Sequence, residues 1–350
     1  MIVTLLKYLS RERFDLALGV VTMADAVYFD DIPEDVEFID LQARRVRNVP
    51  PKLIGLVNSW QPDVIFSTLW HLNLLLAILK PIFFSKIIVI GRENKVVSEW
   101  LKYQDNKFIS KLAYRVFYKK LDYLVCQSQD MLKDMVDSYG ISSDKSSVIY
   151  NPLDIDKVRK LSGDRSEFIH LSPSEGNAIN FVSAGRISVQ KGFDILLEAF
   201  FLCSDLPITL SILGEGILKD QLQEKASDYG IEDRIFFKGF KKNPYSWFAK
   251  ADAFILSSRY EGFPNVVLEA LACGTPVIAT PAPGGIHEIL DKIPQCEIAE
   301  AISAPALARS IRNWVNRHPG RVPDEIVAPY AVEHVVRQYE DVICRHFDIC

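Results

Sequence analysis

The stretch from 253 to 280 constrains the fold most, because it is a complete strand, loop, helix and strand in succession. The apolar run 253–256 predicts a short buried strand. Apolar residues then recur at helical spacing, with Pro264 suited to the first helical position and Gly274 to the residue just past the helix end. A second apolar strand follows at 277–279. Two strands joined through a helix run parallel, so the stretch predicts one unit of a parallel α/β sheet.

Two acidic residues lie on either side of the start of this helix. A helix N-terminus presents unpaired backbone N–H groups and a partial positive charge, and both favour an anion. Gly262 allows a close approach of the backbone there. Glu261 precedes the helix and Glu269 lies about one turn inside it, where a carboxylate can accept hydrogen bonds from paired hydroxyls. A diphosphate with a sugar at one end and a ribose at the other fits this pattern. The alternative is an ordinary βαβ unit with solvated acids.

The spacing of these two acids closely resembles the Glu-x7-Glu signature of the family 4 glycosyltransferases. Members of that family are retaining enzymes with the GT-B fold, in which two Rossmann-like domains face each other across a cleft. The resemblance implies that Glu261 lies beside the transferred sugar and that Glu269 holds the ribose of the donor.

A second motif, 185–192, occurs some 70 residues earlier and carries two cations. Arg186 offers a planar fork and Lys191 a point charge, and both bind phosphate well. The spacing of a Walker loop is absent. The motif resembles the Gly-Arg…Lys-Gly pair of the same family, so Arg186 and Lys191 are expected to neutralise the departing diphosphate. The resemblance further implies a donor-binding set made of Gly185, Gly239, Phe240, Gly262, Phe263, Asn265, Val266 and Glu269.

The length of 350 residues predicts two domains. We expect an N-terminal, acceptor-side Rossmann-like domain over 1–152 and a nucleotide-sugar-binding domain over 178–330, with the polar stretch 172–177 between them. The family resemblance predicts that a terminal helix over 331–350 packs back on the first domain.

The N-terminal half also alternates between predicted helices and strands. Its first residues already form an amphipathic helical face. In the resembled family a strand and a Gly-rich loop precede this helix, so we expect the first domain to lack its first strand. Strands are predicted at 15–21, 36–40, 62–67, 86–90 and 123–126.

Polar residues follow two of these predicted strands, where α/β proteins place their sites. His71 follows one strand, and Arg92, Glu93 and Asn94 follow another. They resemble the acceptor side of the family's cleft, in a subgroup that transfers N-acetylhexosamines or hexoses. A structural role for His71, and a surface ion pair for Arg92 and Glu93, are the alternatives.

The segment 100–120 is basic, because six Lys and Arg residues against one Asp give it a net charge of +5, whereas the whole chain has −5. Cations recur every four residues beside an apolar stripe formed by Ile109, Leu112, Ala113, Val116 and Phe117. Such a helix can dock on an anionic membrane surface. The alternative is a solvated basic face over a stripe that belongs to the core.

The composition further narrows the class of protein to which the chain can belong. A net charge of −5 argues against general nucleic-acid binding. Six scattered cysteines without a Cys-x-x-Cys pair predict reduced thiols. Neither a signal peptide nor an uninterrupted apolar span of about 20 residues is recognised. We therefore expect a cytoplasmic protein, peripheral on the inner face of the plasma membrane.

Together these features predict a retaining glycosyltransferase. It would transfer a hexose or N-acetylhexosamine from a nucleoside-diphosphate donor, which we expect to be UDP-linked. The acceptor would be a glycan or a polyprenyl-linked molecule in the synthesis of cell-surface polysaccharide or lipopolysaccharide. No cofactor or metal is expected, because two cations and a helix end can neutralise the leaving group. A nucleotide-sugar epimerase of the same architecture and a non-catalytic binding partner are the alternatives.

Overall fold

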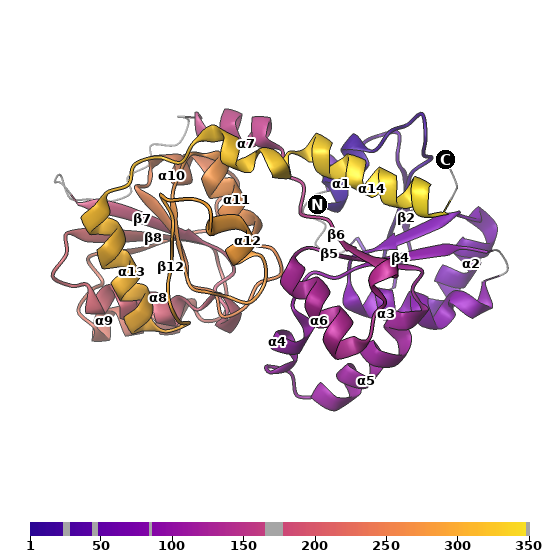
Figure 1. Ribbon diagram of the computed structural model, residues 1–350, viewed down its shortest axis with the longest axis horizontal. Helices are drawn as coiled ribbons and strands as arrows, with labels where there is room; N and C mark the ends of the chain where they lie inside the picture. The colour runs from indigo at the N-terminus through magenta and orange to yellow at the C-terminus, as the bar shows by residue number, and fades with distance from the viewer. Residues whose placement is uncertain (24–28, 44–47, 84–85, 165–177, 348–350) are drawn as a thin grey trace. The chain divides into compact units, whose positions relative to one another are not determined.

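The computed structural model describes residues 1–23, 29–43, 48–83, 86–164 and 178–347 (Figure 1). The chain forms two compact units. The first comprises Met1–Pro152 and Val332–Cys350, and the second comprises Leu153–Ala331. Among the described helices, none is long and apolar enough to cross a membrane.

The second unit is built on one parallel sheet, whose strands lie in the order β12-β11-β10-β7-β8-β9. The chain runs outward from β7 to β9, and then returns to the other side of β7 with β10. The direction of winding therefore reverses between β7 and β10. The strands are β7 (Ile179–Ala184), β8 (Ile208–Leu213), β9 (Ile235–Gly239), β10 (Ala253–Leu256), β11 (Val277–Ala279) and β12 (Glu297–Ile298).

Helices cover both faces of this sheet (Figure 1). In the main core, Phe181 of β7 packs edge-on against Phe200 and Trp314, which come from α8 and α13. The helices are α7 (Ile155–Ser162), α8 (Phe193–Leu202), α9 (Lys219–Asp228), α10 (Tyr245–Lys250), α11 (Asn265–Ala272), α12 (Ile286–Leu290) and α13 (Ala304–Arg317), with 3-10 turns η6 (Val189–Lys191) and η7 (Asp324–Tyr330).

The first unit contains two separate parallel sheets, β1-β2 and β3-β4-β5-β6. The strands are β1 (Ala17–Val20), β2 (Glu37–Asp40), β3 (Val64–Ser67), β4 (Ile88–Arg92), β5 (Tyr123–Cys126) and β6 (Ser146–Val148). The helices are α1 (Ile2–Tyr8), α2 (Pro50–Trp60), α3 (Trp70–Leu79), α4 (Val97–Leu101), α5 (Lys107–Phe117), α6 (Gln129–Tyr139) and α14 (Val332–Phe347), with 3-10 turns η1 (Phe29–Asp31), η3 (Lys80–Ile82), η4 (Tyr118–Lys120) and η5 (Ser143–Lys145).

The last helix, α14, is part of this first unit. Its apolar face packs with α1 against the larger sheet, where Val335 and Tyr339 join a cluster that includes Leu5 and Ile90. A buried polar bond adds to this packing, because Arg92 Nε on β4 donates to Tyr339 Oη at 2.9 Å. The two ends of the chain thus share one core.

Several element boundaries differ from those predicted. The basic segment 100–120 is not one helix, because α4 ends at Leu101 and α5 begins at Lys107 after a turn rich in polar residues. β4 extends through Arg92, so Gly91 and Arg92 lie in the strand and not after it. Pro264 precedes α11 as its N-cap instead of occupying the first helical position. The polar stretch 172–177 lies outside the described residues.

The prediction that all six cysteines are reduced is wrong. Cys126, Cys203, Cys273 and Cys296 are free thiols, whereas Cys344 takes part in a disulfide. The positions of cysteines in a sequence do not show which of them the fold brings together. The disulfide at Cys344 could therefore not be predicted from the sequence.

Candidate active site

The candidate active site of the second unit lies where the winding of its sheet reverses. β7 and β10 are neighbours in the sheet, and both run in the same direction. The loops that leave their carboxyl ends are 185–192 and 257–264, the two segments that carry the predicted motifs. In open α/β sheets, ligands bind at this reversal point, outside the carboxyl ends of the strands.

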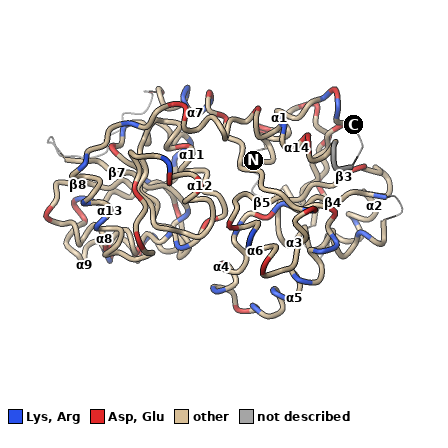
Figure 2. Tube along the Cα trace, in the orientation of Figure 1, with Lys and Arg blue, Asp and Glu red and all other residues tan. Residues whose placement is uncertain are grey.

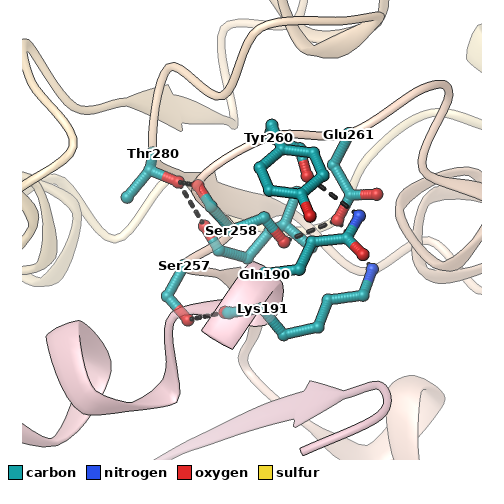
Figure 3. Close-up of polar contacts among 8 residues, drawn as sticks. Gln190, Lys191, Ser257, Ser258, Tyr260, Glu261 and Thr280 are labelled. Atoms are coloured by element: carbon teal, nitrogen blue, oxygen red, sulfur yellow. Dashed lines mark hydrogen bonds and ion pairs between the residues drawn. The ribbon is translucent and has the colours of Figure 1, made fainter. Parts of the chain in front are cut away.

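The two loops meet through a buried ion pair (Figure 3). Lys191 Nζ donates to Glu261 Oε1 at 2.6 Å, and Ser258 Oγ donates to the same oxygen at 2.5 Å. Glu261 is almost fully buried, whereas 19% of the Lys191 side chain remains exposed. A carboxylate and an ammonium group thus meet at the end of the sheet, where the lysine side chain is partly exposed.

Further hydrogen bonds fix the two loops against each other (Figure 3). Ser257 Oγ donates to the Lys191 carbonyl at 2.9 Å, and Gln190 Nε2 donates to the Tyr260 carbonyl at 3.1 Å. Thr280 Oγ1, just after β11, donates to the Ser258 carbonyl at 2.6 Å. None of these supporting side chains was predicted, although Ser257 and Ser258 directly follow a buried strand, which is a usable signal.

Two glycines permit the close packing of these loops. Gly192 has φ +63°, and a Cβ there would lie 2.1 Å from the Ser257 carbonyl oxygen. Gly284 has φ +127°, and a Cβ there would lie 2.6 Å from the Glu261 carbonyl oxygen. Both positions require a left-handed backbone and lack space for a side chain, so only glycine fits.

Arg186 and Arg259 differ in what they contact. Arg186 is exposed, and no hydrogen bond or ion pair of its side chain occurs within the described residues. Arg259 makes a bidentate pair with Asp194 at 2.8 and 2.6 Å, and this pair lowers the pKa of Asp194. Arg186 is therefore the arginine that remains available to an anion.

The predicted ribose ligand Glu269 is half-buried on α11. Burial raises its pKa to about 7. No hydrogen bond or ion pair joins it to Arg186 or Lys191 within the described part of the chain. The structure thus brings Lys191 and Glu261 into contact and leaves Glu269 as a separate carboxyl group in surroundings that oppose its charge.

Residues at the start of α11 have different environments. Phe263 is buried, where its ring lies 5.7 Å from that of Tyr330 and closely covers Gly285. Its side chain is therefore part of the core, and only its backbone can face a ligand. Gly262 is buried, Asn265 is exposed and Val266 is half-buried.

The remaining predicted donor residues follow β7 and end β9. Gly185 lies under Lys191, whose Cε would be 3.3 Å from a Cβ at that position. Gly239 adopts φ +73°, and the next residue, Phe240, is 70% exposed. An exposed aromatic ring after a sharp turn is suited to stack on a flat ligand.

The predicted acceptor residues lie in the first unit, and two of them are deeply buried. Arg92 bonds to Asn151 as well as to Tyr339, and Glu93 is completely buried. A surface ion pair between Arg92 and Glu93 is therefore wrong, because both side chains bond to other partners inside the core. Asn94 is exposed.

Glu93 belongs to a buried polar cluster. Its Oε2 accepts from Tyr118 Oη at 3.0 Å and from Tyr114 Oη at 3.3 Å, and burial raises its pKa. Near it, Lys95 lies 4.2 Å from the centre of the Trp100 ring, and burial lowers the pKa of that lysine. Lys95 was not among the predicted residues, because nothing in the spacing shows that it lies on a tryptophan.

His71 lies next to this cluster at the start of α3. Its ring makes an edge contact with that of Trp70, with 5.7 Å between the ring centres. Burial, and then the nearby charge of Lys95, lower the pKa of the imidazole. A neutral imidazole can accept as well as donate a hydrogen bond.

The chain contains one Asp-x-Asp triplet, 154–156. Asp154 Oδ1 accepts from the backbone N–H of Lys157 at 2.9 Å and thereby caps α7. Within the described ranges, no group of three or more His, Cys, Asp or Glu side chains could hold a metal ion. The triplet is accounted for by helix capping.

Comparison with known proteins agrees with this architecture. The crystal structure of Anabaena Alr3699/HepE in complex with UDP-glucose matches with a TM-score of 0.76 and 18% identity, over 98% of this chain and 94% of that one. A sucrose-phosphate synthase of Thermosynechococcus elongatus matches with a TM-score of 0.75 and 15% identity, over 96% and 90%. The chain therefore has the α/β, GT-B fold.

Sequence comparison identifies the family. The profile described as Glycosyltransferase Family 4 matches residues 1–157, and that described as Glycosyl transferases group 1 matches residues 164–322. The chain belongs to the family 4 glycosyltransferases.

Among the curated relatives, an uncharacterized glycosyltransferase of Methanocaldococcus jannaschii is 29% identical over 264 residues, covering 73% of this chain and 64% of the relative. N-acetylgalactosamine-N,N'-diacetylbacillosaminyl-diphospho-undecaprenol 4-alpha-N-acetylgalactosaminyltransferase of Campylobacter jejuni is 31% identical over 195 residues, covering 54% and 50%. These matches thus span between half and two thirds of the relatives' lengths.

Proposed function

We propose that this protein is a retaining glycosyltransferase that takes its sugar from a UDP-linked hexose or N-acetylhexosamine. The observation that carries the proposal is the Lys191–Glu261 pair at the reversal point of the second sheet. The exposed Arg186 follows the same strand as Lys191. Two cations and one carboxylate are what a charged diphosphate beside a neutral sugar requires.

In the proposed reaction, the bond between the anomeric carbon and the diphosphate oxygen breaks, and the acceptor hydroxyl forms the new bond on the same face of the sugar. The electron pair of the broken bond stays on the diphosphate. Arg186, Lys191 and the backbone N–H groups at the start of α11 stabilise that charge. The proton of the acceptor hydroxyl passes to the departing phosphate oxygen, so a separate base is unnecessary.

The two acids have different proposed tasks. Glu261, which Lys191 and Ser258 hold in place, lies beside the transferred sugar. Glu269 accepts hydrogen bonds from the ribose hydroxyls. Gly239 and Phe240 border the base. No metal takes part in this proposal, because the cations and the helix end already neutralise the leaving group.

The class of donor and acceptor is proposed from the relatives. Anabaena Alr3699/HepE was crystallised with UDP-glucose, and the Campylobacter enzyme is named for a diphospho-undecaprenol acceptor. A lipopolysaccharide 1,6-galactosyltransferase of Escherichia coli is also similar, at 26% identity over 183 residues. We propose a glycan or polyprenyl-linked acceptor in the synthesis of cell-surface polysaccharide or lipopolysaccharide, with His71, Arg92, Glu93 and Asn94 on the acceptor side.

A lipid-linked acceptor requires contact with a membrane, and α5 offers a suitable surface. Phe108, Ile109, Leu112 and Val116 are 80%, 69%, 53% and 45% exposed. Ile109, Leu112 and Val116 of the predicted stripe are exposed, so the alternative that the stripe belongs to the core is wrong for these three residues. Ala113 and Phe117 are half-buried.

The exposed apolar residues of α5 are interleaved with cations. Lys107, Lys111 and Arg115 lie on the same helix (Figure 2). Exposed apolar side chains beside cations suit the interface of an anionic bilayer. We propose that the protein works as a peripheral protein on the inner face of the plasma membrane.

The donor proposal is tested by calorimetric titration with UDP, UDP-glucose, UDP-N-acetylglucosamine and UDP-N-acetylgalactosamine. We expect at least one sugar nucleotide to bind. Lys191→Ala should weaken this binding at least tenfold, because an ion contact to phosphate is lost. Lys225→Ala, on the surface of α9, is the matched control and should leave affinity unchanged. Unaltered binding by Lys191→Ala would contradict the assigned role.

The same samples separate the alternatives. An epimerase would convert the sugar nucleotide without an acceptor, whereas a transferase would release UDP only slowly until an acceptor is added. A non-catalytic partner would bind without releasing UDP under either condition. Nuclear magnetic resonance of the sugar-nucleotide mixture distinguishes all three.

A further inference from the structure

Lys95 is a half-buried lysine of the first unit that follows the end of β4 by three residues. Its ammonium group makes no hydrogen bond or ion pair within the described part of the chain. Burial lowers the pKa of Lys95, and the charge of the nearby Glu93 opposes this shift only in part. The fold therefore keeps a cation here without an anion in contact with it.

Two tryptophan rings hold the ammonium group instead. Lys95 Nζ lies 4.2 Å from the centre of the Trp100 ring and 5.6 Å from the centre of the Trp70 ring. The two rings also contact each other, with 5.4 Å between their centres. The negative face of an indole attracts a cation. The rings thus fix the position of the ammonium group, but they offer no oxygen atom that could accept its N–H groups.

The tryptophan rings are themselves fixed by the core of the first unit. The Trp70 ring stacks on that of Tyr114, with 6.2 Å between the centres and 20° between the planes. Tyr114 is 1% exposed, and its hydroxyl donates to Glu93 Oε2 at 3.3 Å. Lys95 therefore lies on a supported aromatic surface and not on a mobile loop side chain.

The ammonium group is accessible to a ligand. Six buried side-chain nitrogen and oxygen atoms lack a partner among the described residues, and Lys95 Nζ is not one of them. Since Nζ has no partner either, it must reach solvent. Trp70 and Trp100 are only half-buried.

The neighbours of Lys95 include further hydrogen-bond donors. The charge of Lys95 contributes, after burial, to the lowered pKa of His71, so the two side chains are close. The imidazole of His71 can donate one N–H, and Asn94 is exposed beside it in the chain. Arg92 and Glu93 are buried and bonded to protein groups. A ligand at this point would therefore meet Lys95 and not Arg92 or Glu93.

We propose that Lys95, held on the rings of Trp70 and Trp100, binds an oxyanion carried by the acceptor, which is either a phosphate or a carboxylate. A lysine ammonium is a point charge with three rotatable donors, so it can serve either group. The acceptor is then a charged molecule and not a neutral glycan. The inference rests on the proposed transferase function, because only a transferase has an acceptor, but it involves neither Lys191 nor Glu261.

The test uses nuclear magnetic resonance of the full chain with 15N-labelled tryptophan, which gives one indole signal for each of the five tryptophans. Tryptophan-to-phenylalanine variants assign the signals. The probes are inorganic diphosphate, N-acetylglucosamine 1-phosphate, glucuronate and neutral methyl glucoside. We expect saturable shifts of the Trp70 and Trp100 signals with an anionic probe and none with methyl glucoside. Trp314, in the core of the second unit, is the internal reference.

The order of affinities distinguishes the two kinds of oxyanion. Tighter binding of the two phosphates than of glucuronate would identify an acceptor that carries phosphate. The reverse order would identify an acceptor that carries an acidic sugar.

Two methionine variants make the test specific. Lys95→Met removes the charge but keeps a flexible apolar side chain over the tryptophans, and it should weaken binding at least tenfold because a charged hydrogen bond is lost. Lys133→Met, at an exposed lysine of α6 in the same unit, is the matched control and should leave the titration unchanged. Lys95→Arg keeps the charge and should restore binding in part.

The donor site is separated from this site by a second titration on Lys191→Ala. The shifts of Trp70 and Trp100 should persist, because neither loop of the donor site, 185–192 or 257–264, contains a tryptophan. Sugar-nucleotide binding that Lys191→Ala leaves unaltered would overturn the donor assignment alone.

Four results would overturn the inference about Lys95. They are no shift of Trp70 and Trp100 with any anionic probe, an equal shift with methyl glucoside, an unchanged response in Lys95→Met, and a shift confined to Trp247. The last would place the anions in the second unit, where Lys238 and Lys241 lie near the Trp247 ring.

Discussion

At the scale of single residues, Glu269 combines a raised pKa with a half-buried carboxyl group on α11. Its pKa is about 7 in the folded chain and 4.5 in the unfolded one. The folded state therefore binds the proton more tightly, and the stability that this contributes below pH 4.5 is lost as the pH rises through 7. The ionised carboxylate of Glu269 therefore destabilises the folded state. Side chains with such shifted pKa values are common at binding sites.

Glu269→Gln is therefore expected to raise the free energy of unfolding at pH 8 by about 1–3 kcal/mol and to have little effect at pH 4.5. Urea unfolding at both pH values measures the difference. The variant should also weaken sugar-nucleotide binding, because an amide accepts hydrogen bonds from hydroxyls less strongly than a carboxylate does.

Binding by the unaltered protein should weaken as the pH falls through about 7, where Glu269 takes up a proton. The Glu269→Gln variant should lack this dependence, which calorimetry at several pH values can check. A variant that binds as well as the original protein at pH 8 would exclude the ribose role.

The proximity of some of these residues could be predicted from the sequence. Glu261 and Lys191 lie 70 residues apart, but each follows a predicted parallel strand, and strand ends meet at one edge of a sheet. The contacts of Arg92 and Glu93 could not be foreseen, because they depend on Tyr339, Tyr114 and Tyr118, whose positions the pattern does not give.

At the scale of elements, the loops after β7 and β10 pack so closely that Gly192 has no space for a side chain. We expect Gly192→Ala to destabilise the second unit by about 2–4 kcal/mol, from left-handed strain and from the clash with the Ser257 carbonyl. Thermal unfolding gives the value. Gly230→Ala is the control, since Gly230 also has φ +63° but has no atom within 4 Å of an added Cβ, and it should cost about 1 kcal/mol.

For α5, the triple change of Lys107, Lys111 and Arg115 to Gln should reduce binding to vesicles that contain phosphatidylserine. Each cation contributes about 1 kcal/mol near an anionic surface, so the loss should be about 100-fold. Co-sedimentation at low and high salt measures it, and neutral vesicles should bind weakly throughout.

The apolar part of the same surface is tested by Phe108→Ser with Ile109→Ser. Binding should again fall, while Ile217→Ser in the second unit, where Ile217 is 95% exposed, should have no effect. If the double variant sediments with anionic vesicles like the original protein, α5 is not the docking surface.

At the scale of the whole molecule, the strands and most helices were predictable from periodicity, and the α/β class followed from their alternation. The gap between β1 and β3 was not predictable as a cavity, because it depends on how α2 and α3 pack beneath the two sheets. The break between α4 and α5 was also missed, since cations every four residues suggested one continuous helix.

The two units have separate cores, so a change in one should leave the other intact. Arg92→Met leaves Tyr339 and Asn151 without their buried partner, and it should lower the stability of the first unit by about 3–5 kcal/mol. Arg312→Met, which removes a surface pair with Asp205 in the second unit, should cost at most about 1 kcal/mol. Hydrogen exchange followed by mass spectrometry reports each unit separately, and equal losses in both units would contradict independent cores.

The second unit interrupts the first, because the chain leaves the first unit after Pro152 and returns to it at Val332. This has a consequence for synthesis on the ribosome. Residues 153–331 can complete their core before α14 is synthesised, whereas the first unit must wait for α14, which follows the whole second unit along the chain. A nascent chain stalled before Val332 should therefore carry one finished unit and one that still exposes the apolar surface that α14 covers.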